Sequence, residues 1–143
     1  MAAGLAAAIC LGAPPVAKER PFEIVWTDFQ SGMKLAEKEG KPSMIYFTAV
    51  WCNWCKKLEK EAFKVPEVVE LSRKFVCIWV DGDKQPALLD RYNIDEYPTV
   101  VFSTSKGKEV LRIPDYVPAE DFLAKMKIAL VKTGVEKPTG KEE

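Results

Sequence analysis

The sequence contains no histidine. Histidine is the commonest general base near neutral pH and the commonest metal ligand, so its absence excludes the usual histidine-dependent catalysis and most zinc sites. Neither charge is in excess, because 21 basic and 21 acidic residues give a formal net charge of +0. Without a basic patch, we expect no binding to nucleic acid. The chain also has no glycine-rich phosphate loop and no set of metal-ligating residues, so we expect no bound cofactor and no metal.

The 143 residues are 48% hydrophobic and 29% charged, which is typical of one globular domain. Residues 1–17 differ, because they carry no charged side chain and are rich in Ala and Leu, like the apolar part of a secretory signal peptide. No Lys or Arg precedes this run, so a disordered leader is the alternative. The run is shorter than the roughly 20 residues of a membrane helix. We therefore expect a domain at 18–134 that is exported to the periplasm and not inserted in the membrane, with a cytoplasmic location as the alternative, and a flexible tail at 135–143.

Two of the four cysteines, Cys52 and Cys55, lie in the motif WCNWCK at residues 51–56. The motif follows an apolar, strand-like run and precedes a helix-like stretch, so a strand delivers Cys52 to a helix N-terminus. Free backbone N–H groups and the helix dipole favour a thiolate there. We predict that Cys52 is the nucleophile and that Cys55, one turn further in and more buried, is the resolving cysteine. The alternative is a static structural disulfide, whereas Cys77 is expected to be buried and inert.

Hydrophobic periodicity predicts alternating strands and helices in the order β-α-β-α-β-α-β-β-α. The alternating first part favours parallel strands with helices on both faces, and the final hairpin adds an antiparallel edge, which gives a mixed α/β sheet. Strands are predicted at 22–26, 43–48, 75–80, 99–103 and 109–113, and helices between Asp28 and Gly40, after Cys55 with a break at Pro66, at 86–92 and at 118–131.

The cysteine motif at a strand–helix junction, together with Pro98-Thr99 before an apolar run, resembles the thioredoxin superfamily over residues 22–131. Residues 39–42 and 55–63 are similar to the C-terminal domain of the membrane thiol:disulfide interchange reductase and its stand-alone periplasmic relatives. The resemblance implies a thiol:disulfide oxidoreductase that acts on protein thiols and disulfides. It favours the reductive direction, with electrons from an upstream membrane reductase. The alternatives are a protein disulfide oxidase or isomerase of the same fold, and a non-catalytic binding module.

The same resemblance implies that Tyr97 and Pro98 are joined by a cis peptide bond beside the thiols, where the backbone pairs with an extended substrate. The alternative is that Pro98 only begins an edge strand. We assign Trp51 and Thr99 to the same substrate-binding site. Trp54, between the two cysteines, either contacts a partner or packs against an adjacent loop.

Thioredoxins typically carry a buried Asp six residues before the first motif cysteine, and this sequence has Tyr46 there. A phenol with an ordinary pKa near 10 is a poor base at neutral pH. Glu59 lies one helical turn after Cys55, so it is the candidate for proton transfer to and from that sulfur. The alternative is a solvated Glu59 that pairs with Lys56 or Lys60. Lys56 is also expected to add positive potential near the nucleophile.

Overall fold

The structure is a computed structural model that describes residues 22–139. Strands and helices alternate along this part of the chain, as the sequence predicts, and the fold ends with a strand pair and a helix. The strands are β1 (Trp26–Thr27), β2 (Ser43–Thr48), β3 (Val76–Asp81), β4 (Thr99–Ser103) and β5 (Glu109–Ile113). The helices are α1 (Phe29–Glu39), α2 (Asn53–Glu61), α3 (Pro66–Ser72), α4 (Pro86–Tyr92) and α5 (Ala119–Lys132).

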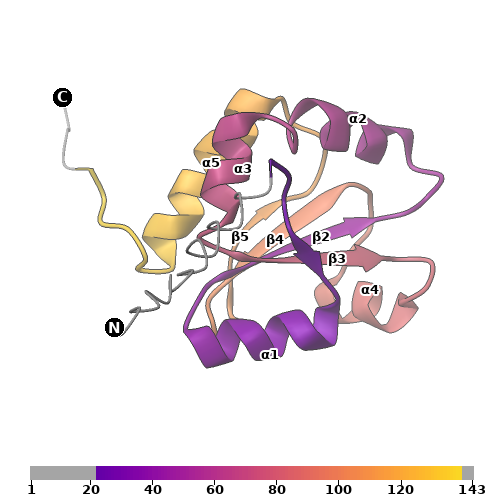
Figure 1. The fold of residues 1–143 in the computed structure, drawn as a ribbon. Coiled ribbons are helices and arrows are strands. Elements are labelled where there is room, and N and C mark those ends of the chain that lie inside the picture. The colour runs from indigo at the N-terminus through magenta and orange to yellow at the C-terminus, as the bar shows by residue number, and fades with distance from the viewer. Residues whose placement is uncertain (1–21, 140–143) are drawn as a thin grey trace, which may run out of the picture.

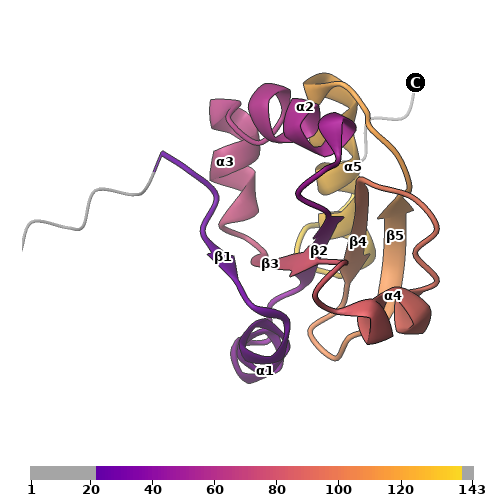
Figure 2. The same ribbon diagram turned by 90° about the vertical axis from the view of Figure 1, so that its right-hand side faces the viewer.

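The five strands form one sheet in the order β1-β3-β2-β4-β5. Strands β1 and β2 run parallel to β3, whereas β4 is antiparallel to β2 and β5 is antiparallel to β4. Figures 1 and 2 show α2, α3 and α5 on one face of this sheet and α1 and α4 on the other. The predicted mixed α/β fold with helices on both faces and an antiparallel edge is therefore confirmed.

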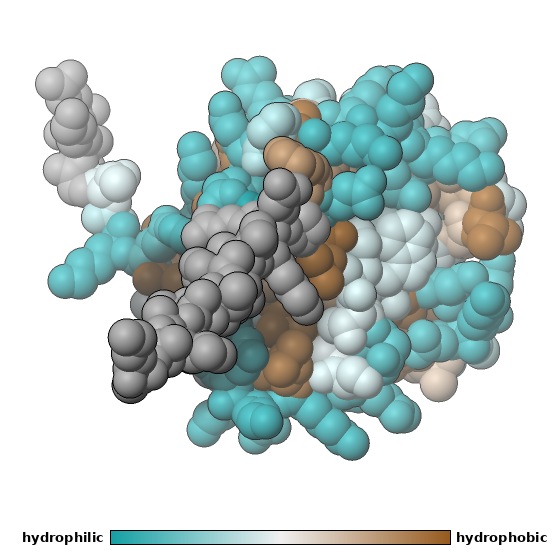
Figure 3. All heavy atoms as spheres, viewed as in Figure 1, coloured by the Kyte–Doolittle hydropathy of each residue, from teal (hydrophilic) through white to brown (hydrophobic). Residues whose placement is uncertain are grey.

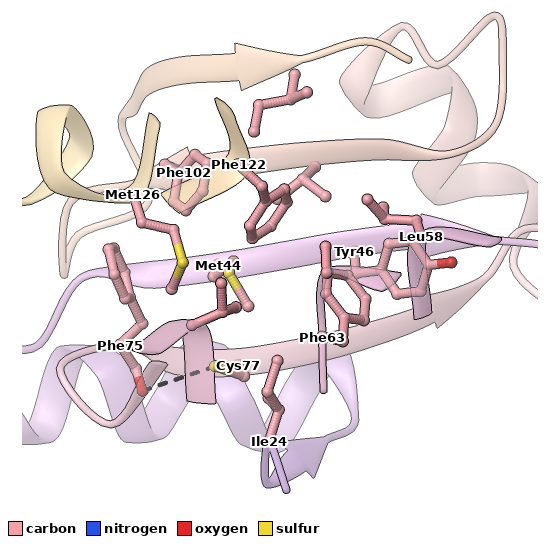
Figure 4. Close-up of a cluster of buried hydrophobic side chains, with 14 of the residues drawn as sticks. Ile24, Met44, Tyr46, Leu58, Phe63, Phe75, Cys77, Phe102, Phe122 and Met126 are labelled. Carbon is pink, nitrogen blue, oxygen red and sulfur yellow. Dashed lines mark hydrogen bonds between the residues drawn. The ribbon is translucent and has the colours of Figure 1, made fainter. Parts of the chain in front are cut away.

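Strand β2 lies at the centre of the sheet, and all six of its residues are buried. Met44 and Tyr46 face the core under α2, α3 and α5, and Ile45 and Phe47 face the core over α1 and α4. A strand covered on both faces needs apolar side chains that point to either side. This explains the uninterrupted apolar run at 44–47. Figure 4 shows the first of these cores, in which Phe122 of α5 and Phe63, between α2 and α3, lie with Met44, Tyr46 and Phe102 of the sheet.

The first strand is shorter than predicted. Strand formation was expected at 22–26, but only Trp26 and Thr27 pair with β3, opposite Cys77 and Ile78. The prediction was therefore wrong for 22–25, because this segment has apolar residues but no neighbouring strand along its length. Phe22 is accordingly exposed.

Helix α1 is bounded by the residues that the sequence indicates. The Asp28 carboxylate accepts a hydrogen bond from the Ser31 backbone N–H at 3.0 Å, and Gly40 ends the helix in the left-handed conformation at φ 64°. Helix α1 also packs closely on the sheet at Gly32, where a Cβ atom would lie 2.5 Å from Cγ1 of Ile78. This close contact holds one face of β3 in place, and β3 in turn supports β2.

The predicted leader at 1–17 lies outside the described residues. Beyond α5, the backbone N–H groups of Val135 and Glu136 donate to the carbonyl of Leu130, and Glu136 forms an ion pair with Lys74. The division into leader, domain at 18–134 and tail at 135–143 remains a prediction. None of the helices in residues 22–139 has the length and apolar character that crossing a membrane requires.

Candidate active site

The two motif cysteines form a disulfide at the start of α2, as Cys52 is the N-cap residue of this helix. Its Sγ accepts a hydrogen bond from the backbone N–H of Cys55 at 3.1 Å. A sulfur atom thus takes the place that a Ser or Asp oxygen usually fills, and the same N–H stabilises negative charge on sulfur when the disulfide is reduced. Cys52 is 5% exposed and Cys55 is 0% exposed, so Cys55 is the more buried of the two, as the sequence predicts.

Pro98 lies at the same edge of the sheet as the disulfide. Strand β4 begins at Thr99, which is opposite Phe47 near the end of β2, and β2 leads directly into the cysteine motif. The peptide bond between Tyr97 and Pro98 is cis, as expected. The Thr99 hydroxyl donates to the carbonyl of Glu96 at 2.7 Å, so this side chain closes its own turn.

Trp51 is joined to two other segments of the chain. Its indole N–H donates to Oδ2 of Asp83 at 2.9 Å, and its ring meets the ring of Tyr97 edge-on with centroids 5.6 Å apart. Burial, followed by the nearby Asp83 and Asp81, raises the pKa of Tyr97 above its ordinary value. The sequence analysis did not single out Asp83, because its partner lies in another loop and no local pattern marks it.

Tyr46 and Glu59 lie together under α2. The Tyr46 hydroxyl donates to Oε2 of Glu59 at 3.0 Å and also lies 3.4 Å from the carbonyl oxygen of Cys55. Burial raises the pKa of Tyr46, which keeps the phenol protonated and able to donate. Hollows of about 170 and 230 Å³ both have Glu59 and Trp79 in their walls, so the carboxylate lies between the buried phenol and solvent.

Neither Lys56 nor Lys60 is seen to pair with Glu59 in the described part of the chain, where the ion pairs involve other residues. Lys56 is exposed, and its backbone N–H donates to the carbonyl of Cys52 at 3.2 Å. The alternative of a Glu59 bound by these lysines therefore finds no support. The influence of Lys56 on the nucleophile stays a prediction.

The loop between β2 and α2, together with the first turn of α2, presents an apolar surface around the disulfide. Val50 is 73% exposed, Trp51 62% and Trp54 55%. In the space-filling view, a hydrophobic area is visible at the edge of the molecule where this loop lies (Figure 3). Trp54 also packs on the ring of Tyr116 in the loop before α5, with centroids 5.4 Å apart, so the expected packing against a neighbouring loop is confirmed, whereas contact with a partner stays a prediction.

Cys77 lies in β3 and belongs to the core rather than to the site (Figure 4). It is 4% exposed, and its Sγ lies 3.5 Å from the carbonyl oxygen of Ser72. Burial raises the pKa of the Cys77 thiol to about 12. This thiol is therefore protonated and covered, as the sequence analysis expects.

The comparisons with known proteins agree with this geometry. A family model for the thioredoxin-like domain matches residues 29–129, and the chain belongs to this family. A thioredoxin from Thermus thermophilus superposes with a TM-score of 0.72 at 26% identity, covering 85% of this chain and 99% of that one. The fold and the Cys52–Cys55 pair define a thiol:disulfide oxidoreductase of the thioredoxin type.

Within this class, the chain is similar to the thiol:disulfide interchange protein DsbD. DsbD of Tatumella citrea is 29% identical over 113 residues, which are 75% of this chain but only 20% of that protein's length. The C-terminal domain of DsbD from Neisseria meningitidis, in its reduced form, has a TM-score of 0.62 at 25% identity and covers 73% of this chain and 99% of that domain. The chain therefore corresponds to one part of DsbD.

We expect iodoacetamide to leave Cys77 unmodified in the native protein at pH 8. A pKa of about 12 leaves roughly one thiol in ten thousand ionised at this pH, and the side chain is covered as well. Unfolding in guanidinium chloride should make Cys77 reactive, and peptide mass spectrometry distinguishes the two states. Cys52, labelled after reduction with dithiothreitol, is the positive control. Modification of Cys77 in the folded protein would show that its side chain is accessible.

Proposed function

We propose that this chain reduces disulfides in protein substrates, with Cys52 as the nucleophile and Cys55 as the resolving cysteine. The observation that carries the proposal is the position of the disulfide at the N-cap of α2, where the Cys55 N–H donates to the Cys52 sulfur. The helix dipole and this hydrogen bond favour the thiolate on Cys52, the less buried of the two cysteines.

The reaction transfers two electrons from the protein to its substrate. The Cys52 thiolate attacks one sulfur of the substrate disulfide, which forms a mixed disulfide and releases the other substrate sulfur as a thiolate that takes up a proton. Cys55 then loses its proton and attacks the Cys52 sulfur. This step releases the second substrate thiol, which also takes up a proton, and leaves the Cys52–Cys55 disulfide.

Glu59 is proposed to carry the proton that Cys55 loses. Its carboxylate is held by the Tyr46 hydroxyl at 3.0 Å, and the same hydroxyl lies 3.4 Å from the Cys55 carbonyl, so the three groups are neighbours. Tyr46 is proposed as a positioning residue, since burial raises its pKa and keeps it from acting as the base itself. The pair thus serves in place of the buried Asp of other thioredoxins.

The substrate is proposed to bind across the surface formed by the cysteine motif and the loop before β4. Pro98 and Tyr97 supply the backbone that an extended substrate strand pairs with, and Thr99 closes the turn that holds them. Two exposed apolar contacts flank the disulfide, Trp51 beside Tyr97 and Trp54 on the other side.

Reduction requires a source of electrons, because the reaction leaves the protein oxidised. We propose that an upstream membrane thiol reductase regenerates the dithiol and that the protein works in the periplasm or another exported location. The similarity to the C-terminal domain of DsbD and the apolar composition of residues 1–17 support both points. Protein disulfides are the proposed substrates.

We expect the wild-type protein to accelerate the reduction of insulin by dithiothreitol, measured as turbidity, and Cys52→Ser to lose this acceleration. The reason is that Cys52 is the less buried of the two motif cysteines and lies at the start of α2. Equal rates for the two proteins would instead support a non-catalytic binding module. The glutathione equilibrium of the same preparation separates the other alternative: a reduction potential near about −270 mV fits a reductase, and one near about −120 mV would assign the chain to the oxidases.

Glu59→Gln is expected to slow the resolution of the mixed disulfide by about 100-fold near pH 7, the lower end of what a positioned general base contributes. The deficit should shrink as the pH rises past about 8.5, where a thiol of ordinary pKa ionises without assistance. Stopped-flow Trp fluorescence in a single turnover measures this step, and the urea unfolding midpoint checks the fold. A rate equal to that of wild type at every pH would remove Glu59 from the mechanism.

Cys55→Ala is expected to trap partners as mixed disulfides with Cys52, because the resolving sulfur is missing. Mass spectrometry of the trapped species from a periplasmic extract with its membranes should find both substrates and a membrane thiol reductase. The matched control is the double variant Cys52→Ser, Cys55→Ala, which should trap neither. Capture of soluble substrates with no membrane reductase would argue against the proposed electron donor.

A further inference from the structure

One face of α2 next to the disulfide meets the loop between β5 and α5. Trp54, Lys57 and Glu61 follow one another at helical spacing along this face, and Tyr116 faces them from the loop. Both ribbon views show the chain passing beside α2 between β5 and α5 (Figures 1 and 2). We call these four side chains the aromatic ledge.

The aromatic ledge is held together by contacts among its own members. The Lys57 ammonium lies 5.0 Å from the ring centroid of Trp54 and 5.0 Å from that of Tyr116, and the two rings are 5.4 Å apart. The Tyr116 hydroxyl donates to the Glu61 carboxylate, and this hydrogen bond raises the pKa of Tyr116. Trp54 is thereby placed beside the cysteines before any substrate arrives.

The ledge is open to a partner although it is internally ordered. Trp54 is 55% exposed, and Lys57 is exposed as well. No ion pair found within residues 22–139 involves Lys57, so its ammonium meets two aromatic faces and no carboxylate. The one carboxylate of the ledge, on Glu61, accepts from Tyr116.

The charges around the ledge are positive on the side of the disulfide. The first turn of α2 contains no acidic residue, and Lys56 and Lys57 follow Cys55 directly. The positive end of the helix dipole adds to this potential. A negatively charged group would therefore be attracted to Lys57, which forms no ion pair within residues 22–139.

We propose that the aromatic ledge is a substrate-binding subsite, which recognises an acidic side chain next to the cysteine of a client polypeptide. Trp54 packs on the client chain, and Lys57 pairs with the Asp or Glu. The inference rests on the proposed function and adds a substrate preference to it. It also gives Trp54 a role distinct from that of Trp51, which is bonded to Asp83 on the opposite side of the motif.

The test uses two disulfide-bonded peptides that differ only in a Glu or a Lys beside the cysteine. Prereduced full-length protein is mixed with each peptide, and the second-order rate constants are compared. At low salt, wild type should reduce the Glu peptide about fivefold faster than the Lys peptide, as expected for one exposed charge pair. The ratio should fall towards one in Lys57→Met and should also decrease at high salt.

Lys60→Met is the matched control, because it removes an exposed lysine one turn further from the disulfide on the same helix. It should keep the wild-type ratio. Trp54→Ala should lower the rate constants for both peptides by about tenfold, since it removes the apolar contact that they share. Urea unfolding midpoints establish that all three variants are folded.

Three results would overturn the inference: equal rates for the two peptides with wild type, an unchanged ratio in Lys57→Met, or the same loss of ratio in Lys60→Met. Insulin reduction separates these outcomes from a failure of the proposed function. If wild type reduces insulin but does not discriminate between the peptides, only the ledge assignment falls. If it reduces neither insulin nor the peptides, both proposals fall.

Discussion

The hydrogen bond from the Cys55 backbone N–H to the Cys52 sulfur joins the fold of this protein to its chemistry. The first N–H groups of a helix have no partner within the helix, so a residue at the N-cap must supply one. Cys52 supplies its sulfur, so the atom proposed as the nucleophile is oriented by the same contact that begins α2. The contact depends on β2, whose six buried residues contribute to both cores and fix the point at which the loop before Cys52 begins.

The site is assembled where three strands meet at one edge of the sheet. Parallel strands β2 and β3 end there, and antiparallel β4 begins there after Pro98. The loops that follow or precede these strands consequently lie together, although they are far apart in the sequence. This arrangement brings Trp51 into contact with Asp83 and Tyr97 on one side of the disulfide. Trp54, in the first turn of α2, lies on the other side.

The replacement of a buried Asp by Tyr46 illustrates how the interior constrains the chemistry. A phenol fits among the aromatic rings of this core, whose centroids lie 4.9 Å from that of Tyr46 for both Phe63 and Trp79. Burial raises its pKa, so the phenol stays protonated and donates its O–H to the Glu59 carboxylate. The carboxylate here is that of Glu59, which lies between the phenol and solvent. The group proposed for proton transfer therefore lies outside the apolar centre of the core.

The sequence alone determined the order of strands and helices, the apolar strand at 43–48 and the placement of Cys52 at a helix start. These features depend on side-chain periodicity and capping within a few residues, so local patterns predict them. Only the tertiary structure decided that β1 has two residues, that Asp83 holds Trp51 across 32 positions, and that Glu61 meets Tyr116 across 55. Such contacts depend on how loops and strand edges meet after the layers have packed, and no local spacing encodes that geometry.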